Sequence, residues 1–149
     1  MSLHTGAIVT ALLLVAAPTF AQQEQAAGRI KIASGSVFIV RGGNVLAAKA
    51  GDLVKEADHL RTGSDGRLGV TLKDDTRLSL GPSSEVQLDS FLYAPADGRL
   101  GMVLRFVRGV AAYVSGRIAK LAPDSIRLET PSAIVGIRGT TVAVNVQPQ

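Results

Sequence analysis

Residues 67–88 read "RLGVTLKDDTRLSLGPSSEVQL", and apolar and polar side chains alternate along them between turn signals. Such alternation predicts β-strands with one buried face and one wet face. Asp74-Asp75 and Gly81-Pro82-Ser83 interrupt the alternation and predict turns. The apolar positions expected to point into a core are Leu68, Val70, Leu72, Leu78, Leu80, Val86 and Leu88.

The same pattern continues on both sides of this stretch. "SVFIVR" (residues 36–41) is a further expected strand, and Pro95-Ala96-Asp97-Gly98 is the strongest hairpin-type loop. Only residues 117–122 favour a helical turn, which Pro123 would end. Strands that recur about every 8–12 residues predict an all-β fold. Because each strand pair is short, we expect stacked short strands in a β-solenoid or β-roll-like arrangement.

The first 21 residues, "MSLHTGAIVTALLLVAAPTFA", have the layout of a secretory signal peptide. The apolar run from Ala7 to Ala17 is shorter than a membrane span needs. We expect cleavage after Ala21, with Ala26 or Ala27 as alternatives, and an uncleaved anchor as the rival interpretation. The mature chain is then periplasmic or secreted, with a flexible tether at 22–28 and one β domain at 29–147. The chain contains no cysteine, which excludes a disulfide framework and a lipid-modified cysteine.

The formal charge of +4 is concentrated in the second half of the chain, where residues 98–149 hold seven basic and two acidic side chains. A basic half can attract anionic lipid or nucleic acid. The basic residues are spread singly, however, and the chain has no Trp, two Tyr and four Phe. Stacking of bases requires aromatic platforms, so nucleic-acid binding is not expected.

No catalytic, metal or cofactor site is expected. A calcium loop using Asp58, Asp65 and Asp74 or Asp75 would need carboxylates in one compact loop, and these are scattered. His59 is the one histidine after the signal segment, and no cysteine or second histidine accompanies it. No nucleophile elbow, phosphate-binding loop or aromatic-lined carboxylate pair is present. We therefore expect a protein that is not an enzyme.

The last stretch, "ETPSAIVGIRGTTVAVNVQPQ" (residues 129–149), predicts a strand, a glycine kink at Gly139-Thr140 and a final alternating strand. Arg138 as a binding residue for carboxylate or phosphate is the functional alternative. The final strand is a candidate partner-binding edge, because no later strand is expected to cover it. The valines on one face of this final strand are Val142, Val144 and Val146.

In their order along the chain, these motifs resemble the FecR domain family, over about residues 34–146. The matching positions, which we expect to be structural, are Gly51, Asp52, Thr62, Gly63, Asp65, Gly66, Gly109, Pro131, Arg138, Gly139 and Thr140. Gly63 and Gly66 can take positive φ, and Asp65-Gly66 is a favoured pair for a tight turn.

The resemblance implies an exported, β-rich domain with a role in binding or sensing. Well-known members are periplasmic parts of transducers that regulate a sigma factor in response to an outer-membrane transporter. This chain departs from them, with a signal peptide where a cytoplasmic segment and a membrane helix are usual, and Val142 where an aromatic is common. We therefore expect a module of the cell envelope that binds an unidentified envelope protein. A structural scaffold and a binder of polyanions or lipid surfaces are the alternatives.

Overall fold

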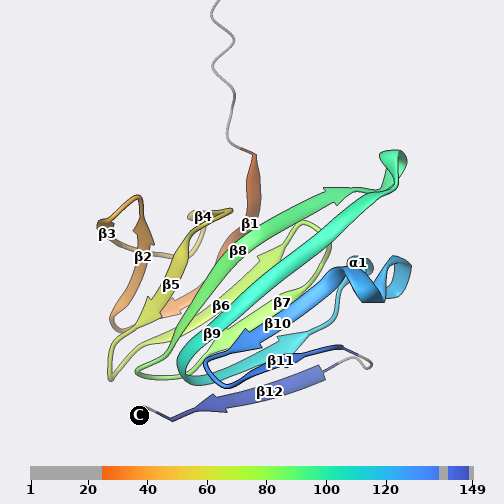
Figure 1. Ribbon diagram of the computed structural model, residues 1–149. Helices are drawn as coiled ribbons and strands as arrows, with labels where there is room; N and C mark the ends of the chain where they lie inside the picture. The colour runs from red at the N-terminus through yellow and green to blue at the C-terminus, as the bar shows by residue number, and fades with distance from the viewer. Residues whose placement is uncertain (1–24, 138–140, 148–149) are drawn as a thin grey trace, which may run out of the picture.

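The computed structural model describes residues 25–137 and 141–147. It is all-β, and its strands form one curled, open sheet that resembles half of a barrel (Figure 1). The all-β prediction is confirmed. The solenoid or roll is not confirmed, because the strands pair in the order β3-β2-β5-β8-β9-β7-β6-β1-β4 rather than coil upon coil.

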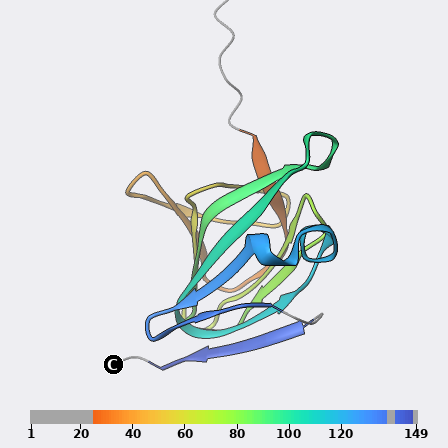
Figure 2. The ribbon, with the colours of Figure 1, turned by 45° about the vertical axis from the view of Figure 1, so that its right-hand side comes forward.

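The sheet curls into two layers that share the long strand β9 (Arg99–Val114). We call the layers A and B. The turned view of Figure 2 shows the curl of the sheet. Layer A contains the second part of β9 together with β1 (Ala26–Ser34), β4 (Leu53–Lys55), β6 (Arg67–Leu72), β7 (Arg77–Leu80) and β12 (Thr141–Val146). Layer B contains the first part of β9 together with β2 (Val37–Arg41), β3 (Asn44–Ala47), β5 (His59–Thr62), β8 (Glu85–Ala94), β10 (Ile126–Thr130) and β11 (Ala133–Val135).

The core lies between the two layers and is made by the alternating apolar residues. All seven apolar positions of the 67–88 stretch are buried, as the sequence predicts. Burial of a large apolar side chain stabilises the fold by roughly 1.5–3 kcal/mol, so the core is the main source of stability. The largest fully buried side chains are Tyr113, Phe106, Ile30, Leu60, Leu78, Leu88, Met102, Leu104, Ile118 and Leu128.

Helical structure is confined to short connections. The 3-10 turn η1 (Pro95–Asp97) joins β8 to β9, at the predicted hairpin loop. The helix α1 (Arg117–Leu121), which the sequence also predicts, and the turn η2 (Pro123–Ser125) carry the chain from β9 to β10. This crossover makes β10 parallel to β9, whereas β11 and β12 pair antiparallel to their neighbours.

One domain boundary differs from the prediction. Residues 26–28, assigned to the flexible tether, belong to β1, and Ala27 and Gly28 are buried. The strand pairs with both β4 and β6 there, so the small residues serve close packing rather than flexibility. A Cβ on Gly28 would lie 2.8 Å from the Cα of Leu72.

Candidate functional site

A row of stacked corners contains five of the eleven residues of the family-like motif. The chain passes between layers A and B near Gly35, at residues 63–66, at residues 81–84 and at Gly109. Backbone hydrogen bonds join each corner to the next: Gly63 N–H donates to Ser36 O (2.9 Å), and Ser83 N–H donates to Gly63 O (2.9 Å). The motif residues Thr62, Gly63, Asp65, Gly66 and Gly109 therefore lie in one structural row, although Gly109 is distant in sequence from the other four.

Thr62 and Ser84 tie two corners together through their hydroxyl groups. The Thr62 hydroxyl donates to Gly81 O (2.7 Å) and accepts a hydrogen bond from Ser84 N–H (2.9 Å). The Ser84 hydroxyl donates a hydrogen bond to Val110 O (3.0 Å) and accepts one from Val110 N–H (2.9 Å). Both side chains are buried, so their hydroxyls replace backbone partners that the bend removes from the ladder.

The glycines of the row are needed for two different reasons. Gly109 has φ +81°, and a Cβ there would collide with Ser84 Oγ and lie 2.6 Å from Ser83 O. Gly63 and Gly66 could take positive φ, but neither does so in this structure. They are small because Ser36 approaches them: a Cβ on Gly66 would collide with Ser36 O, and one on Gly63 would lie 2.9 Å from Ser36 Cβ. Asp65 closes the same corner by accepting from Ser36 N–H (3.2 Å). Hydrogen bonding from the Ser36 side chain, and then from its backbone, lowers the pKa of the Asp65 carboxyl.

The remaining motif residues lie elsewhere. Gly51, with φ +96°, and Asp52 form the turn before β4 and bind β1 through Gly51 N–H to Ile30 O (2.8 Å) and Ile30 N–H to Asp52 O (2.9 Å). Pro131 is exposed in the turn between β10 and β11. Arg138, Gly139 and Thr140 lie outside the described residues.

The candidate partner-binding strand β12 is an edge of layer A. It pairs antiparallel with β9 from Thr141↔Val114 to Val146↔Gly109, and among the described residues it pairs with no other strand. Val142, Val144 and Val146 are half-buried and pack against the core, whereas Thr141, Ala143 and Asn145 are exposed on the outer face. The valines therefore hold the strand in place.

Hydrogen bonding along β9 shows which β12 backbone groups are free. Val110 N–H donates to Ser84 Oγ and Val110 O accepts from Gly81 N–H (2.9 Å), so both groups of Val110 point away from β12. In an antiparallel ladder the groups of successive residues alternate in direction. Ala111 therefore faces its β12 partner Val144, and the N–H and C=O groups of Ala143 and Asn145 point to the open side.

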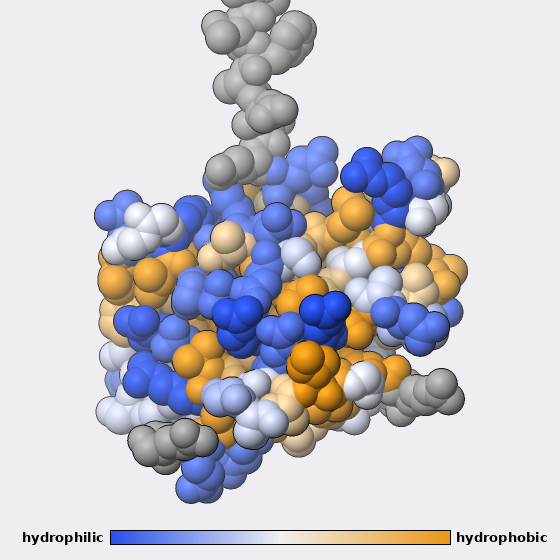
Figure 3. All heavy atoms as spheres, in the orientation of Figure 1, coloured by the Kyte–Doolittle hydropathy of each residue, from blue (hydrophilic) through white to orange (hydrophobic). Residues whose placement is uncertain are grey.

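β11 lies beside β12 in both views, at the open mouth of the half-barrel (Figures 1 and 2). Ile134 and Val135 of β11 are 69% and 36% exposed, and hydrophobic residues gather at the surface over this part of the molecule (Figure 3). A hollow of about 450 Å³ lies between the β10–β11 turn and the end of β12, lined by Val107, Thr130, Pro131, Ser132, Asn145, Val146 and Gln147. Apolar surface and a free strand edge thus occur together.

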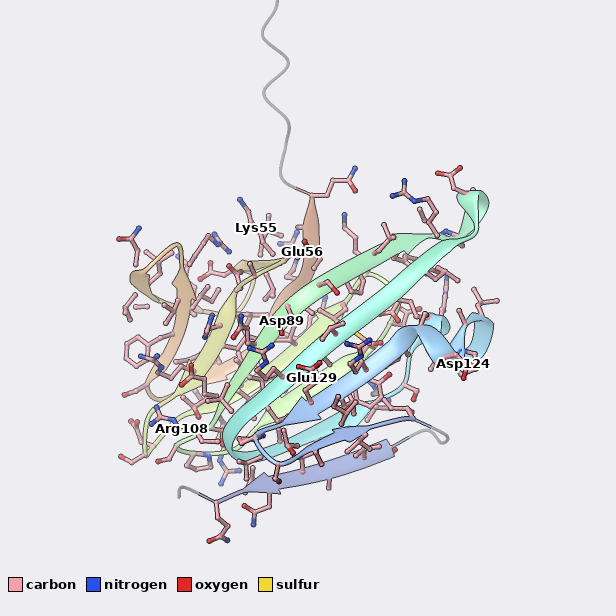
Figure 4. The ribbon with its side chains drawn as sticks, in the orientation of Figure 1. Lys55, Glu56, Asp89, Arg108, Asp124 and Glu129 are labelled. Carbon is pink, nitrogen blue, oxygen red and sulfur yellow. The ribbon has the colours of Figure 1, made fainter. Side chains whose placement is uncertain are left out.

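The charged residues that could suggest chemistry are engaged in ion pairs or in hydrogen bonds within the fold. Asp58 is fully buried, and Arg41 donates to both of its oxygens at 2.8 and 2.7 Å. Arg105 on β9 reaches Asp89 (2.8 Å) and Glu129 (3.3 Å), which lie on the flanking strands (Figure 4). Asp74 accepts from Thr76 N–H, the Thr76 hydroxyl and Ile118 N–H. Within residues 25–137 and 141–147 no group of three His or acidic side chains is placed to hold a metal ion.

Glu85 is the centre of a second charged group on layer B. His59 lies 3.2 Å from it, Arg61 3.4 Å and Arg108 3.6 Å. Burial raises the pKa of the Glu85 carboxyl, but the His59 hydrogen bond and the two arginines outweigh burial and hold the pKa below its ordinary value. His59 is thus a half-buried partner of Glu85 on a sheet face, an interaction that the sequence does not reveal.

Comparison with known families matches residues 58–149 to the family described as FecR protein, which is more than half of the chain. The chain belongs to the FecR family, as its motifs indicate. No curated protein and no solved structure was found to match it. None of the described helices has the length and apolar character that a membrane crossing requires.

Proposed function

We propose that this protein is a binding or sensing module of the cell envelope that recognises a partner protein through the free edge of β12. Membership in the FecR family supports a role in envelope signalling or sensing. The observation that carries the site is the open ladder side at Ala143 and Asn145, next to the exposed apolar residues of β11. An extended segment of a partner can add to such an edge through main-chain hydrogen bonds, while pockets select its side chains.

Export to the periplasm or the outside, after removal of residues 1–21, is part of the same proposal. The signal-like layout of the N-terminal segment supports it. The mass of the protein recovered from the envelope fraction tests it: a mature chain that begins at Gln22 is expected. A cytoplasmic protein that retains Met1 would contradict it.

The proposed function requires no chemistry on a substrate. The buried carboxylates Asp58 and Asp74 are fully used by internal donors, which supports a structural role for them. The module would therefore act by binding alone, without a cofactor or metal.

Capture of partners from an envelope extract tests the edge. The bait is the mature chain from Gln22, compared with its Asn145→Pro variant, and bound proteins are identified by mass spectrometry. Proline removes a free N–H at Asn145 and blocks the approach of an added strand, while the bonds to β9 remain. A protein captured by the wild-type chain and lost with Asn145→Pro supports the proposal.

The control exchanges the same side chain for another polar one and leaves the backbone N–H in place. Asn145→Ser keeps the N–H and should capture as the wild-type chain does. Equal capture by all three baits, with Asn145→Pro folded, would rule out the β12 edge. A blank with the folded wild-type chain would favour a scaffold role over partner binding.

A further inference from the structure

The outer face of layer A contains a shallow trough whose floor consists of small residues. Ser79 on β7, Ala112 on β9 and Ala143 on β12 lie directly opposite one another in register. Val110 and Pro82 line one side of this row, and the open volume above the floor is about 570 Å³. This volume falls within the range of about 300–1,000 Å³ that ligand pockets occupy.

A β-bulge places an isoleucine at the β1 end of the trough. The register between β1 and β6 shifts between Ile30 and Ile32, so that Ile30 pairs with Val70 and Ile32 pairs with Gly69. Ile30 is fully buried, whereas Ile32 is 62% exposed on the outer face. Regular alternation from Ile30 would have buried Ile32 as well, so the bulge redirects an apolar side chain toward solvent.

The exposed apolar surface of the trough combines with an uncompensated positive charge. Arg67 lines the trough and forms no ion pair with any carboxylate in the described part of the chain. On the outer face of layer B, by contrast, Arg61, Arg105 and Arg108 each lie within 4 Å of an acidic partner. A guanidinium without a partner beside an apolar floor favours a ligand that is negative at one end and apolar along the rest.

We propose that this trough binds a single-chain anionic amphiphile, with the acyl chain along Ser79, Ala112 and Ala143 and the anionic head at Arg67. The small side chains leave room for the chain, Val110 lines one side of it, and Ile32 lies at the β1 end. The ligand lies on the face of the sheet and requires neither the β12 backbone edge nor the mouth beside β11. The site is therefore independent of the proposed recognition of a partner strand.

Titration calorimetry with sodium dodecanoate, below the concentration at which it forms micelles, tests the site on the mature chain. We expect saturable binding of one dodecanoate per chain. Ser79→Phe fills the floor and should weaken binding at least tenfold, and Ala112→Phe should do the same if Ser79→Phe does not fold. Arg67→Gln should weaken binding of dodecanoate several-fold while binding of uncharged decanol is unchanged.

Arg77→Gln is the matched control, because Arg77 is exposed in the neighbouring cross-strand row outside the trough lining, and it should bind as the wild-type chain does. Absence of saturable binding, or equal binding by the folded Phe variants, would overturn the proposal. Binding to vesicles of anionic phospholipid without binding of monomeric dodecanoate would also overturn it, since a membrane surface would then be the target. A dimer that Ser79→Phe disrupts, without dodecanoate binding, would assign the trough to a second copy instead.

Discussion

Gly109 stands where β9 passes from layer B to layer A, and its atoms explain why the strand can bend there. The positive φ of +81° turns the chain, and the absence of a Cβ lets Ser84 approach. The Ser84 hydroxyl then accepts the hydrogen bond of Val110 N–H (2.9 Å), while Val110 O accepts from Gly81 N–H. One glycine and one serine thus link the two layers.

Gly109→Ala is expected to lower the free energy of unfolding substantially. Positive φ alone costs a non-glycine residue about 1–3 kcal/mol, and the contact with Ser83 and Ser84 adds to it. Gly98→Ala is the matched control, since Gly98 has φ +64° but nothing within 4 Å of a Cβ, and it should cost only the positive-φ penalty of about 1–2 kcal/mol. Urea unfolding of both variants measures the difference, and equal losses would contradict the contact with Ser84.

Thr62→Val should destabilise the corner row by about 1–3 kcal/mol, because it leaves the buried Ser84 N–H without its acceptor. Thr62→Ser keeps the hydroxyl and should lose less. Urea unfolding distinguishes the two. If Thr62→Ser loses as much free energy as Thr62→Val or more, the threonine methyl group contributes at least as much to the corner as the hydroxyl does, which contradicts this account.

The corner residues also show how far sequence can predict a site. Their presence as turn residues follows from their type, but the reason for Gly66 does not. Its constraint comes from Ser36, thirty positions earlier, which reaches it only after β2 and β5 have paired. Contacts of this kind depend on the tertiary fold, and local patterns do not contain them.

At the scale of strands, β12 has two unlike edges. Val144→Pro removes an N–H that faces β9 and should lower the free energy of unfolding by about 1–3 kcal/mol. Asn145→Pro affects the open side and should cost less than about 1 kcal/mol. Thermal or urea unfolding of the two neighbouring proline variants checks this, and the opposite order would mean that the direction of alternation is reversed.

Strand β1 illustrates the limit of pattern reading at this scale. The polar, small residues around Ala26 were interpreted as tether, yet tertiary pairing with β4 and β6 makes them a strand. Strands with clear alternation, such as residues 67–72 and 141–146, were predicted correctly, because their apolar faces meet the core. The register shift at Ile32 and the parallel pairing of β10 follow from long-range pairing alone.

At the scale of the whole molecule, stability should depend on pH, because Glu85 pairs with basic side chains on the outer face of layer B. The pKa of Glu85 is lowered below its ordinary value of 4.5, so its ionised form stabilises the folded state. This contribution is complete above the unfolded pKa and is lost as pH falls through the lower folded pKa.

Glu85→Gln should therefore flatten the decline of the thermal midpoint as pH falls below about 4.5, measured by circular dichroism. Arg105 does not contact Glu85, so Arg105→Gln is a control that should leave the Glu85-dependent decline in place. An unchanged acid decline in Glu85→Gln would assign the effect to other carboxylates.

Burial raises the pKa of the Tyr113 hydroxyl above its ordinary value of 10.0, so the protonated form stabilises the fold. This stability is present below the unfolded pKa and is lost as pH rises toward the folded pKa. The thermal midpoint should consequently fall above about pH 10, together with a rise in tyrosinate absorbance on unfolding. A midpoint that is constant across this range would contradict the burial effect.

The most direct measurement is amide hydrogen exchange of β12 in the free, mature protein, followed residue by residue by NMR. The proposed recognition edge requires that Val142 and Val144 are protected by β9, while Ala143 and Asn145 exchange rapidly. Strong and equal protection at all four amides would show that the outer edge is already covered in solution, and a partner strand could not add there.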